Sequence, residues 1–373
     1  MRIGLCLWGY ASDDGGGYTF QENFLNALRT NKSSHEIFCF YHGKELPPQE
    51  GQMQWIRVVE STGKQPGRPL NDAVLKHKID LAWFITIPIY EAVDIPYVVT
   101  VWDLAHRVHP YFPEVSVGGW TWDKREAFFQ YLLPRAAYVI TGTEAGKKEV
   151  ANFYLVPADR IRVVPFATPS FALQARPRNA PVAPLPKSPY LFYPANFWPH
   201  KNHVALLLAL KLLIEQERLD FSIVFTGSDK GNLKYIQQVV VDLGLSERVQ
   251  FRGFVPLEEL IYLYQNAFAL AFLSFLGPDN FPPLEAFALM CPVIASKVSG
   301  AEEQMGDAAL LFDPKDEVQL AAMIKKLHST PGLRETLIQR GLARAHQWTT
   351  NDYVHRVFDI AKEFDGIRRC WSR

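Results

Sequence analysis

The stretch from Leu276 to Ser296 sets the architecture of this chain, and it reads Leu-Gly-Pro-Asp-Asn-Phe-Pro-Pro-Leu-Glu-Ala-Phe-Ala-Leu-Met-Cys-Pro-Val-Ile-Ala-Ser. An apolar run at 269–273 precedes it, as expected of a strand buried on both faces. A loop rich in Gly, Pro and Asn follows, and its two prolines pre-set the start of a helix at 283–290. A second apolar run lies at 292–296. This order predicts a strand, a crossover helix and a parallel strand.

The same alternation extends outward in both directions and predicts two α/β domains with a cleft between them. Further strands are predicted at 2–8, 36–41, 54–59, 81–87, 97–102, 138–141, 161–165, 190–193, 221–226 and 249–253. Helices are predicted at 18–30, 120–133, 144–153, 202–216, 230–243, 257–265, 316–329 and 333–346. Eight of the 26 prolines fall between Pro165 and Pro194, which predicts a linker there. We therefore expect one domain at 1–175 and a second at 176–347.

Length and composition agree with this division and exclude several classes of protein. A length of 373 residues suits two domains, and 48% hydrophobic with 21% charged residues excludes wholesale disorder. With 39 Lys+Arg against 39 Asp+Glu, the formal charge is zero, which argues against a nucleic-acid partner. The longest apolar runs have about 11 residues, where a membrane span needs about 20. The four dispersed cysteines and the absence of a signal-peptide pattern favour a cytoplasmic protein.

Three constellations could carry chemistry, and each also has a plain structural explanation. The triple glycine ending at Gly17 lies between a strand and a helix, where backbone can approach an anionic ligand; it could equally be a flexible loop. Lys201 follows a strand and could hold a diphosphate as a point charge, or it could be solvated beside an N-capping Asn202. Glu285 is predicted in the first turn of its helix. It could bind two ribose hydroxyls or simply favour that helix terminus.

Taken together, these segments resemble a known family. The run Ala195-Asn-Phe-Trp-Pro-His-Lys-Asn202, followed by Pro-Pro-Leu-Glu-Ala at 282–286, is similar to the retaining glycosyltransferase family 4. Other segments that agree are 249–256, 300–309, 100–106 and 141–144. The resemblance covers nearly the whole chain. It implies the two-domain GT-B fold, an α/β fold with two Rossmann-like domains, and a C-terminal helix at 348–373 that crosses back to the N-terminal domain.

The resemblance also implies roles for particular residues. Lys201 would contact the diphosphate of a nucleotide sugar, with His200 beside it, and Glu285 would hold the ribose. Phe254 and Val255 would border the base, and the loop at Asn280, Phe281 and Pro282 would face the donor sugar and phosphate. The full set of expected donor-binding residues is Gly16, Gly17, Asn196, His200, Lys201, Gly227, Phe254, Val255, Asp279, Asn280, Phe281, Pro282 and Glu285. Asp103 and His106 are the expected catalytic residues.

Two positions depart from the family pattern. Gly277 stands where the family has a glutamate that contacts donor-sugar hydroxyls, so Asp279 or backbone groups would replace it, or the donor differs, or activity is weak. Trp102 stands where the family commonly has a histidine before Asp103. We interpret the chain as a variant with Gly-Pro-Asp-Asn in the donor loop rather than as an inactive protein.

The resemblance leads to the following expectations. The reaction transfers a hexose with retention from a nucleotide sugar, GDP-mannose being slightly favoured over a UDP-sugar, to a glycan or lipid-linked glycan in surface polysaccharide synthesis. No Asp-x-Asp motif is present, so we expect neither a metal nor a cofactor. The location would be cytoplasmic, with peripheral contact at the inner face of the membrane left open. The alternatives are a non-catalytic nucleotide-sugar-binding protein, or an epimerase or phosphorylase of the same fold.

Overall fold

The computed structural model describes residues 1–7, 16–31, 33–42, 53–59, 67–85, 91–116, 121–176 and 184–371. Within these residues the chain forms two compact units, each built around one parallel sheet. The first unit contains Met1–Val108, Gly118–Phe166 and Thr350–Arg373. The second contains His109–Val117 and Ala167–Thr349.

The first unit is organised by a seven-stranded sheet with the order β3-β2-β1-β4-β5-β6-β7. The strands are β1 (Arg2–Leu7), β2 (Glu36–Tyr41), β3 (Gln54–Arg57), β4 (Leu81–Phe84), β5 (Tyr97–Val101), β6 (Tyr138–Thr141) and β7 (Ile161–Val163). Every neighbouring pair is parallel. The central strands are buried along their whole length, which explains why they read as continuous apolar runs.

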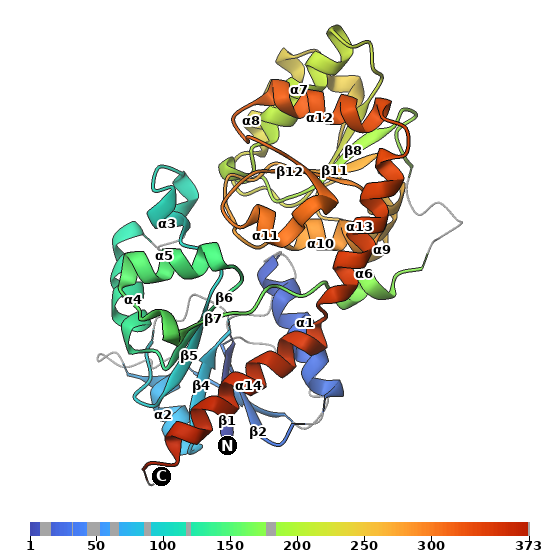
Figure 1. Ribbon diagram of the computed structural model, residues 1–373. Coiled ribbons are helices and arrows are strands. Elements are labelled where there is room, and N and C mark those ends of the chain that lie inside the picture. Colours follow the sequence, from blue (N-terminus) through green and yellow to red (C-terminus); the bar gives the residue numbers. More distant parts are fainter. Residues whose placement is uncertain are drawn as a thin grey trace. The chain divides into compact units, whose positions relative to one another are not determined.

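Helices cover this sheet, and the last helix of the chain is one of them (Figure 1). They are α1 (Gly16–Thr30), α2 (Pro69–Lys76), α3 (Ala105–Val108), α4 (Trp122–Leu132), α5 (Glu144–Tyr154) and α14 (Thr350–Arg368). Tyr353 of α14 is buried, and its ring packs edge-on against Phe20 and Phe24 of α1. At the other end of α14, Arg368 pairs with Asp80 at 3.4 Å. Apolar contact and an ion pair thus both hold α14 to this unit.

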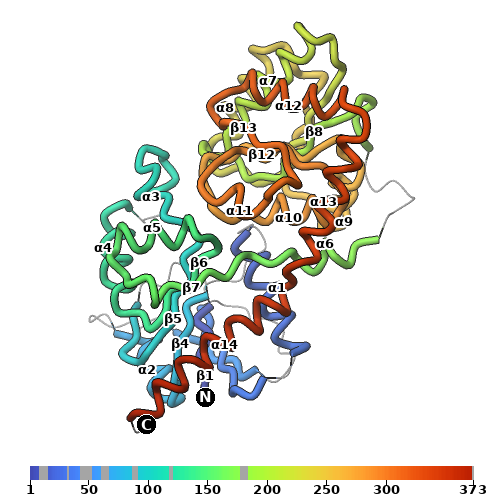
Figure 2. The backbone as a smooth tube through the Cα atoms, in the orientation of Figure 1, coloured from blue at the N-terminus to red at the C-terminus, as the bar shows by residue number. Residues whose placement is uncertain are grey.

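The second unit has a six-stranded parallel sheet with the order β10-β9-β8-β11-β12-β13. Its strands are β8 (Tyr190–Pro194), β9 (Ser222–Thr226), β10 (Val249–Phe251), β11 (Ala269–Phe272), β12 (Val293–Ser296) and β13 (Ala309–Phe312). Its helices are α6 (Ser170–Gln174), α7 (His203–Glu215), α8 (Leu233–Asp242), α9 (Leu257–Asn266), α10 (Phe281–Ala288), α11 (Ala301–Met305), α12 (Glu317–Ser329) and α13 (Leu333–Gln347). Figure 2 shows α7 beside α12 and α10 beside α13.

The predicted alternation of strand and helix is confirmed for both halves, with local differences. Strand β13 and helices α2, α3, α6 and α11 are additional elements that the apolar pattern did not predict. Helix α10 begins at Phe281 rather than at residue 283, so Glu285 lies in its second turn instead of the first. The predicted strand ends at Trp8 and at 86–87, Gly15, and residues 177–183 of the proline-rich stretch lie outside the described residues.

A short segment from the N-terminal half joins the second unit. Residues His109–Val117 cluster with Ala167–Thr349 rather than with the sheet that precedes them in sequence. Phe112 packs against Phe275, with ring centroids 5.7 Å apart, and Glu114 contacts His200. The chain therefore supplies the second unit with residues from two separate parts of the sequence.

Candidate functional site

The first group of predicted site residues lies at the carboxyl edge of the second sheet, where ligands of open parallel sheets bind. Gly227 follows β9 with a φ of +132°, and a Cβ there would lie 2.4 Å from the Ala195 carbonyl oxygen. Only glycine fits this approach. The Asn196 Oδ1 atom accepts the Ser228 N–H at 2.8 Å, so the loops that follow β8 and β9 are joined at this edge.

Lys201 closes the loop after β8, in a short 3-10 turn at Pro199–Lys201. Its Nζ atom lies 5.4 Å from the centre of the Phe272 ring, and its carbonyl accepts the Tyr193 hydroxyl at 2.8 Å. Asn202 takes up a left-handed conformation and donates its Nδ2 to the Pro314 carbonyl at 2.7 Å instead of capping α7. Asn202 thus stands at the N-cap position of α7, as expected, but its side chain holds the turn that carries Lys201 instead of making the capping hydrogen bond.

His200 is held by Glu114, a contact between residues far apart in the sequence. One Glu114 oxygen accepts the His200 backbone N–H at 2.8 Å and also contacts the Nδ1 atom of its ring. Burial raises the pKa of the Glu114 carboxyl, but its hydrogen bonds with His200 outweigh this and hold the pKa below its usual value. The His200 carbonyl in turn accepts the Phe275 N–H at 2.9 Å, which joins this loop to the one after β11.

The loop after β11 contains Gly277 and is fixed by side chains. Gly277 has a φ of +103°, and a Cβ there would lie 2.5 Å from the Asn280 Oδ1 atom. The Asn280 Nδ2 donates to the Gly277 carbonyl at 2.6 Å. Both the backbone conformation and the Asn280 side chain therefore demand glycine at position 277.

Gln304 of α11 braces the same loop from the other side. Its Oε1 accepts the Asn280 N–H at 3.1 Å, while its Nε2 donates to the Asn280 carbonyl at 2.7 Å and to the Asp279 carboxylate. Close packing also depends on Gly300, because a Cβ there would lie 2.2 Å from the Pro278 carbonyl oxygen. Buried Asp279 is thus a partner of Gln304. The geometry of the loop is set both by its own Asn280 side chain and by helix α11.

Glu285 is buried on α10, where only 7% of its surface is exposed. Its Oε2 accepts the Tyr264 hydroxyl at 2.7 Å. Burial raises the pKa of this carboxyl to about 7, although the hydrogen bond from Tyr264 lowers it. At the start of the same helix Phe281 is buried and Pro282 half-buried, while after β10 Phe254 is 60% exposed and Val255 half-buried.

The second group of predicted residues lies in the first unit. Gly17, in the first turn of α1, approaches Trp102, and a Cβ at Gly17 would lie 3.4 Å from the indole ring. Gly16 and Asp103 are both exposed. The Asp103 Oδ1 accepts the Ala105 N–H at 2.9 Å, at the start of α3. The structure therefore brings the glycine turn of α1 next to the loop that follows β5.

His106 is wholly buried, with 0% of its surface exposed. Its ring stacks on Phe129 at 5.2 Å and its Nε2 lies 3.0 Å from the Tyr154 hydroxyl and 3.2 Å from Glu126. Burial lowers the pKa of this histidine to about 4. The sequence predicted that His106 contacts the substrate directly. In this arrangement the side chain has no exposed surface with which to make that contact. The ring faces the interior of its unit.

The sequence analysis did not single out Glu114, Gln304, Tyr264 or Glu126, although all four contact predicted site residues. Gln304 lies within the segment 300–309 that carries the family resemblance, which was the only signal for it. The others lie 20 or more positions from their partners along the chain. Their contacts are properties of the fold.

Comparison with known proteins agrees with these observations. Residues 176–344 match the family described as "Glycosyl transferases group 1". The chain is 31% identical over 235 residues to the O-antigen chain mannosyltransferase B of Escherichia coli, and this alignment covers 62% of this chain and 61% of that relative. The chain thus spans about 61% of that curated relative's length.

Solved structures agree over almost the full length. Sucrose-phosphate synthase from Thermosynechococcus elongatus superposes with a TM-score of 0.75 at 17% identity, covering 98% of this chain and 100% of that one. HepE of Anabaena in complex with UDP-glucose superposes with a TM-score of 0.72 at 16% identity, covering 97% and 100%.

The fold is therefore the α/β GT-B fold, with two Rossmann-like parallel sheets, as the sequence predicted. The C-terminal part of the chain, which contains the edge around Lys201, is similar to the group 1 glycosyltransferases. Among the described residues there is no cluster of three or more His, Cys, Asp or Glu with metal-binding geometry. Within the residues that the structure describes, no helix is both long and apolar enough to cross a bilayer.

Proposed function

We propose that this chain is a retaining glycosyltransferase that moves a hexose from a nucleotide sugar to a glycan or lipid-linked glycan in surface polysaccharide synthesis. The observation that carries the proposal is the braced loop at 277–280 beside the turn that presents Lys201. Both lie at the carboxyl edge of one parallel sheet. A cation and a rigidly held loop at such an edge suit an anionic leaving group.

In this proposal, Lys201 meets the diphosphate and Glu285 accepts hydrogen bonds from the ribose. Gly227 and Asn196 hold the loops after β9 and β8 together where the phosphates approach. Phe254 and Val255 lie beside the base, and the loop from Asp279 to Pro282 faces the sugar. In the first unit, taken by itself, the residues that we assign to substrate contact are Gly16, Gly17 and Asp103. The similarity of residues 176–344 to group 1 glycosyltransferases supports the assignments in the second unit.

The chemical step we propose keeps the anomeric configuration. The bond from C1 of the sugar to the diphosphate oxygen breaks while the acceptor oxygen bonds to C1 on the same face. The acceptor's proton moves to the departing phosphate, so no separate carboxylate nucleophile is required, in contrast to retaining hydrolases. Lys201 stabilises the negative charge that grows on the diphosphate. We propose that neither a metal nor a cofactor takes part.

For the donor, we propose GDP-mannose before a UDP-hexose. The sequence similarity to an O-antigen mannosyltransferase favours mannose, whereas a solved structure with this fold holds UDP-glucose. A lipid-linked acceptor would place the reaction at the inner face of the membrane, with the protein itself cytoplasmic.

The test is a thermal-shift panel with GDP-mannose, UDP-glucose, UDP-galactose and the free nucleotides. A true donor at 100 times its dissociation constant should stabilise the protein by about 2.7 kcal/mol. Lys201→Ala should remove that stabilisation. Lys211→Ala, which alters only the surface pair with Glu215 on α7, should keep it. A panel in which no nucleotide shifts the melting temperature would contradict the proposal.

A non-catalytic nucleotide-sugar-binding protein is the second candidate, because Gly277 lacks the carboxylate of the family pattern. Binding without transfer to any acceptor would favour it. Transfer with an unchanged anomeric configuration, measured by NMR of the product, would favour the retaining enzyme.

A further inference from the structure

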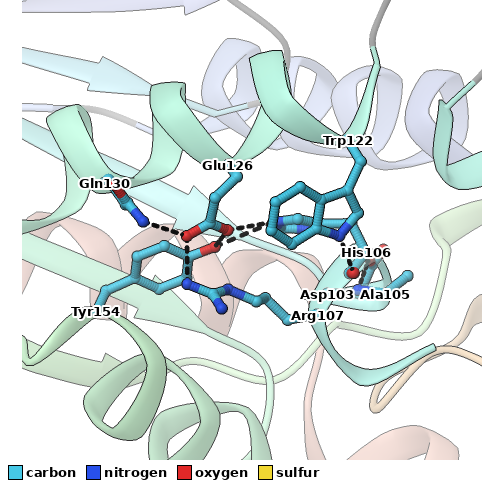
Figure 3. A network of polar contacts seen from close by, with 8 residues as sticks. All are labelled: Asp103, Ala105, His106, Arg107, Trp122, Glu126, Gln130 and Tyr154. Atoms are coloured by element: carbon cyan, nitrogen blue, oxygen red, sulfur yellow. Dashed lines mark hydrogen bonds and ion pairs between the residues drawn. The ribbon is translucent and has the colours of Figure 1, made fainter. Parts of the chain in front are cut away.

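A buried polar network in the first unit joins three helices behind Asp103, and the proposed reaction leaves it unused (Figure 3). Its centre is the Glu126 carboxylate of α4, only 6% exposed. We call the residues around it the Glu126 network: Glu126, His106 and Arg107 of α3, Gln130 of α4 and Tyr154 of α5.

Glu126 accepts from four donors, two on each carboxylate oxygen. Oε1 accepts from the Gln130 Nε2 at 2.6 Å and from the Arg107 guanidinium. Oε2 accepts from the Tyr154 hydroxyl at 2.9 Å and lies 3.2 Å from the His106 Nε2. An ionised carboxylate has about four acceptor sites, so this one is fully satisfied although it is buried.

The charges in the network follow from its geometry. Burial raises the pKa of the Glu126 carboxyl, but the hydrogen bonds it accepts, those from Arg107 and Tyr154 foremost, hold that pKa below its usual value. Burial and, to a smaller extent, the nearby Arg125 lower the pKa of His106 to about 4, although the contact with Glu126 raises it. A neutral ring beside two oxygen acceptors carries its proton on Nε2. The Nδ1 atom, which has no hydrogen-bond partner among the described residues, is then the unprotonated nitrogen.

The network fixes α3, and α3 fixes Asp103. Helix α3 has four residues, Ala105–Val108, too few to be stable alone because helix nucleation is unfavourable. The Trp122 indole N–H of α4 holds the His106 carbonyl at 2.6 Å. The first N–H of α3, that of Ala105, donates to the Asp103 carboxylate at 2.9 Å. Asp103 itself is exposed and can therefore meet a substrate.

We propose that Glu126 is a positioning residue that sets the place of Asp103 through α3, with His106 as one of its links. This rests on the proposed function, in which Asp103 contacts the donor sugar or the acceptor. It assigns the buried histidine a supporting place in the site rather than direct contact. Three contacts in series connect Glu126 to Asp103. They are the four hydrogen bonds on the Glu126 carboxylate, the backbone of α3, and the hydrogen bond from the Ala105 N–H to Asp103.

The experiment compares Glu126→Gln, Asp103→Ala and the double variant in a transfer or donor-hydrolysis assay. Glutamine keeps the size of the side chain but turns an N–H group toward residues that are already donors. We expect kcat to fall about 10- to 100-fold, the scale of a misplaced reacting group. Donor KM should stay within about twofold, because Lys201 and its loop are untouched. Glu36→Gln, at an exposed pair with Arg2, is the matched control and should behave as wild type.

The double variant separates positioning from an independent role. If Glu126 acts through Asp103, the double variant is no slower than Asp103→Ala. Multiplying effects, or a wild-type kcat for Glu126→Gln, would overturn the inference. If Glu126→Gln does not fold, Tyr154→Phe removes one of the four bonds and keeps the ring. It should lower kcat with unchanged KM, and a wild-type kcat would again overturn the inference.

The same assay distinguishes this inference from the proposed function. A wild-type chain that neither binds a nucleotide nor transfers a sugar would refute the function, and the role of Glu126 with it. A wild type that turns over while Glu126→Gln loses nothing would refute the positioning role alone.

Discussion

Replacing Gly277 tests whether its loop demands glycine for two separate reasons. The residue has a φ of +103°, and a Cβ would lie 2.5 Å from the Asn280 Oδ1. A non-glycine residue in such a region costs about 1–3 kcal/mol. Pushing the Asn280 amide away also loses its bond to the Gly277 carbonyl, about 0.5–1.5 kcal/mol. Gly277→Ala should therefore destabilise the protein by about 2–4 kcal/mol.

Gly231 provides a matched control in the same unit. Its φ is +99°, close to that of Gly277, but an added Cβ would meet nothing within 4 Å. Gly231→Ala thus reports the backbone strain alone. The difference between the two alanine variants reports the clash with Asn280, about 0.5–1.5 kcal/mol.

The measurement is urea unfolding of both glycine variants, of Asn280→Ala and of the Gly277→Ala/Asn280→Ala pair. Removing the Asn280 side chain relieves the clash, so the pair should cost about 1 kcal/mol less than the sum of its single changes. Gly277→Glu should lower transfer activity rather than restore a family carboxylate. Equal destabilisation by Gly277→Ala and Gly231→Ala, or a more active Gly277→Glu, would refute the reasoning.

Three further outcomes are expected. Burial lowers the pKa of His203 to about 3, so the stability that neutral His203 contributes is present above about pH 6.5 and is lost as pH falls toward 3. In urea unfolding at several pH values, His203→Phe should lose less stability over this range than wild type. The same dependence of unfolding free energy on pH in both proteins would contradict this. Burial raises the pKa of Glu285 to about 7, so its contribution to stability is greatest below the ordinary pKa of glutamate and declines as pH rises to 7. Without nucleotide, the free energy of unfolding of Glu285→Gln should rise relative to wild type by about 3 kcal/mol between pH 4.5 and 7. Equal dependence of unfolding free energy on pH in the two proteins would count against this. Chelation of divalent metals with EDTA should leave transfer activity unchanged, and activity that needs added Mg²⁺ or Mn²⁺ would overturn the metal-free proposal.

The sheets could be predicted because buried parallel strands are apolar along their whole length. Strand β11 consists entirely of apolar residues, and β9 has three of them at its centre, so a short window of sequence identifies both strands. Strand β13 lies at the sheet edge and reads Ala-Leu-Leu-Phe. Four apolar residues are too few to distinguish a strand from part of a helix, so it was not predicted. The start of α10 was misplaced because Pro282 and Pro283 pre-set a helix, yet the first turn already includes Phe281.

The site could be predicted only as far as local sequence carries it. Gly277 and Lys201 follow strand ends, a position that sequence shows. The brace by Gln304, 24 positions from Asn280, and the grip of Glu114 on His200, 86 positions apart, depend on how distant segments meet. The burial of His106 could not be predicted for the same reason. A histidine that follows a strand is expected to be exposed from local sequence, and only the packing of distant helices buries it.

Residues 109–116 belong to the second unit, and this affects any attempt to produce that unit as a separate fragment. A fragment beginning near Ala167 would contain every strand of the second sheet. It would lack Phe112 and Glu114, leaving the Phe275 ring uncovered and the His200 amide without its acceptor. Under the proposed function, such a half-molecule would bind nucleotide more weakly than the intact chain even if correctly folded. A synthetic peptide of the missing segment, added in trans, could restore it.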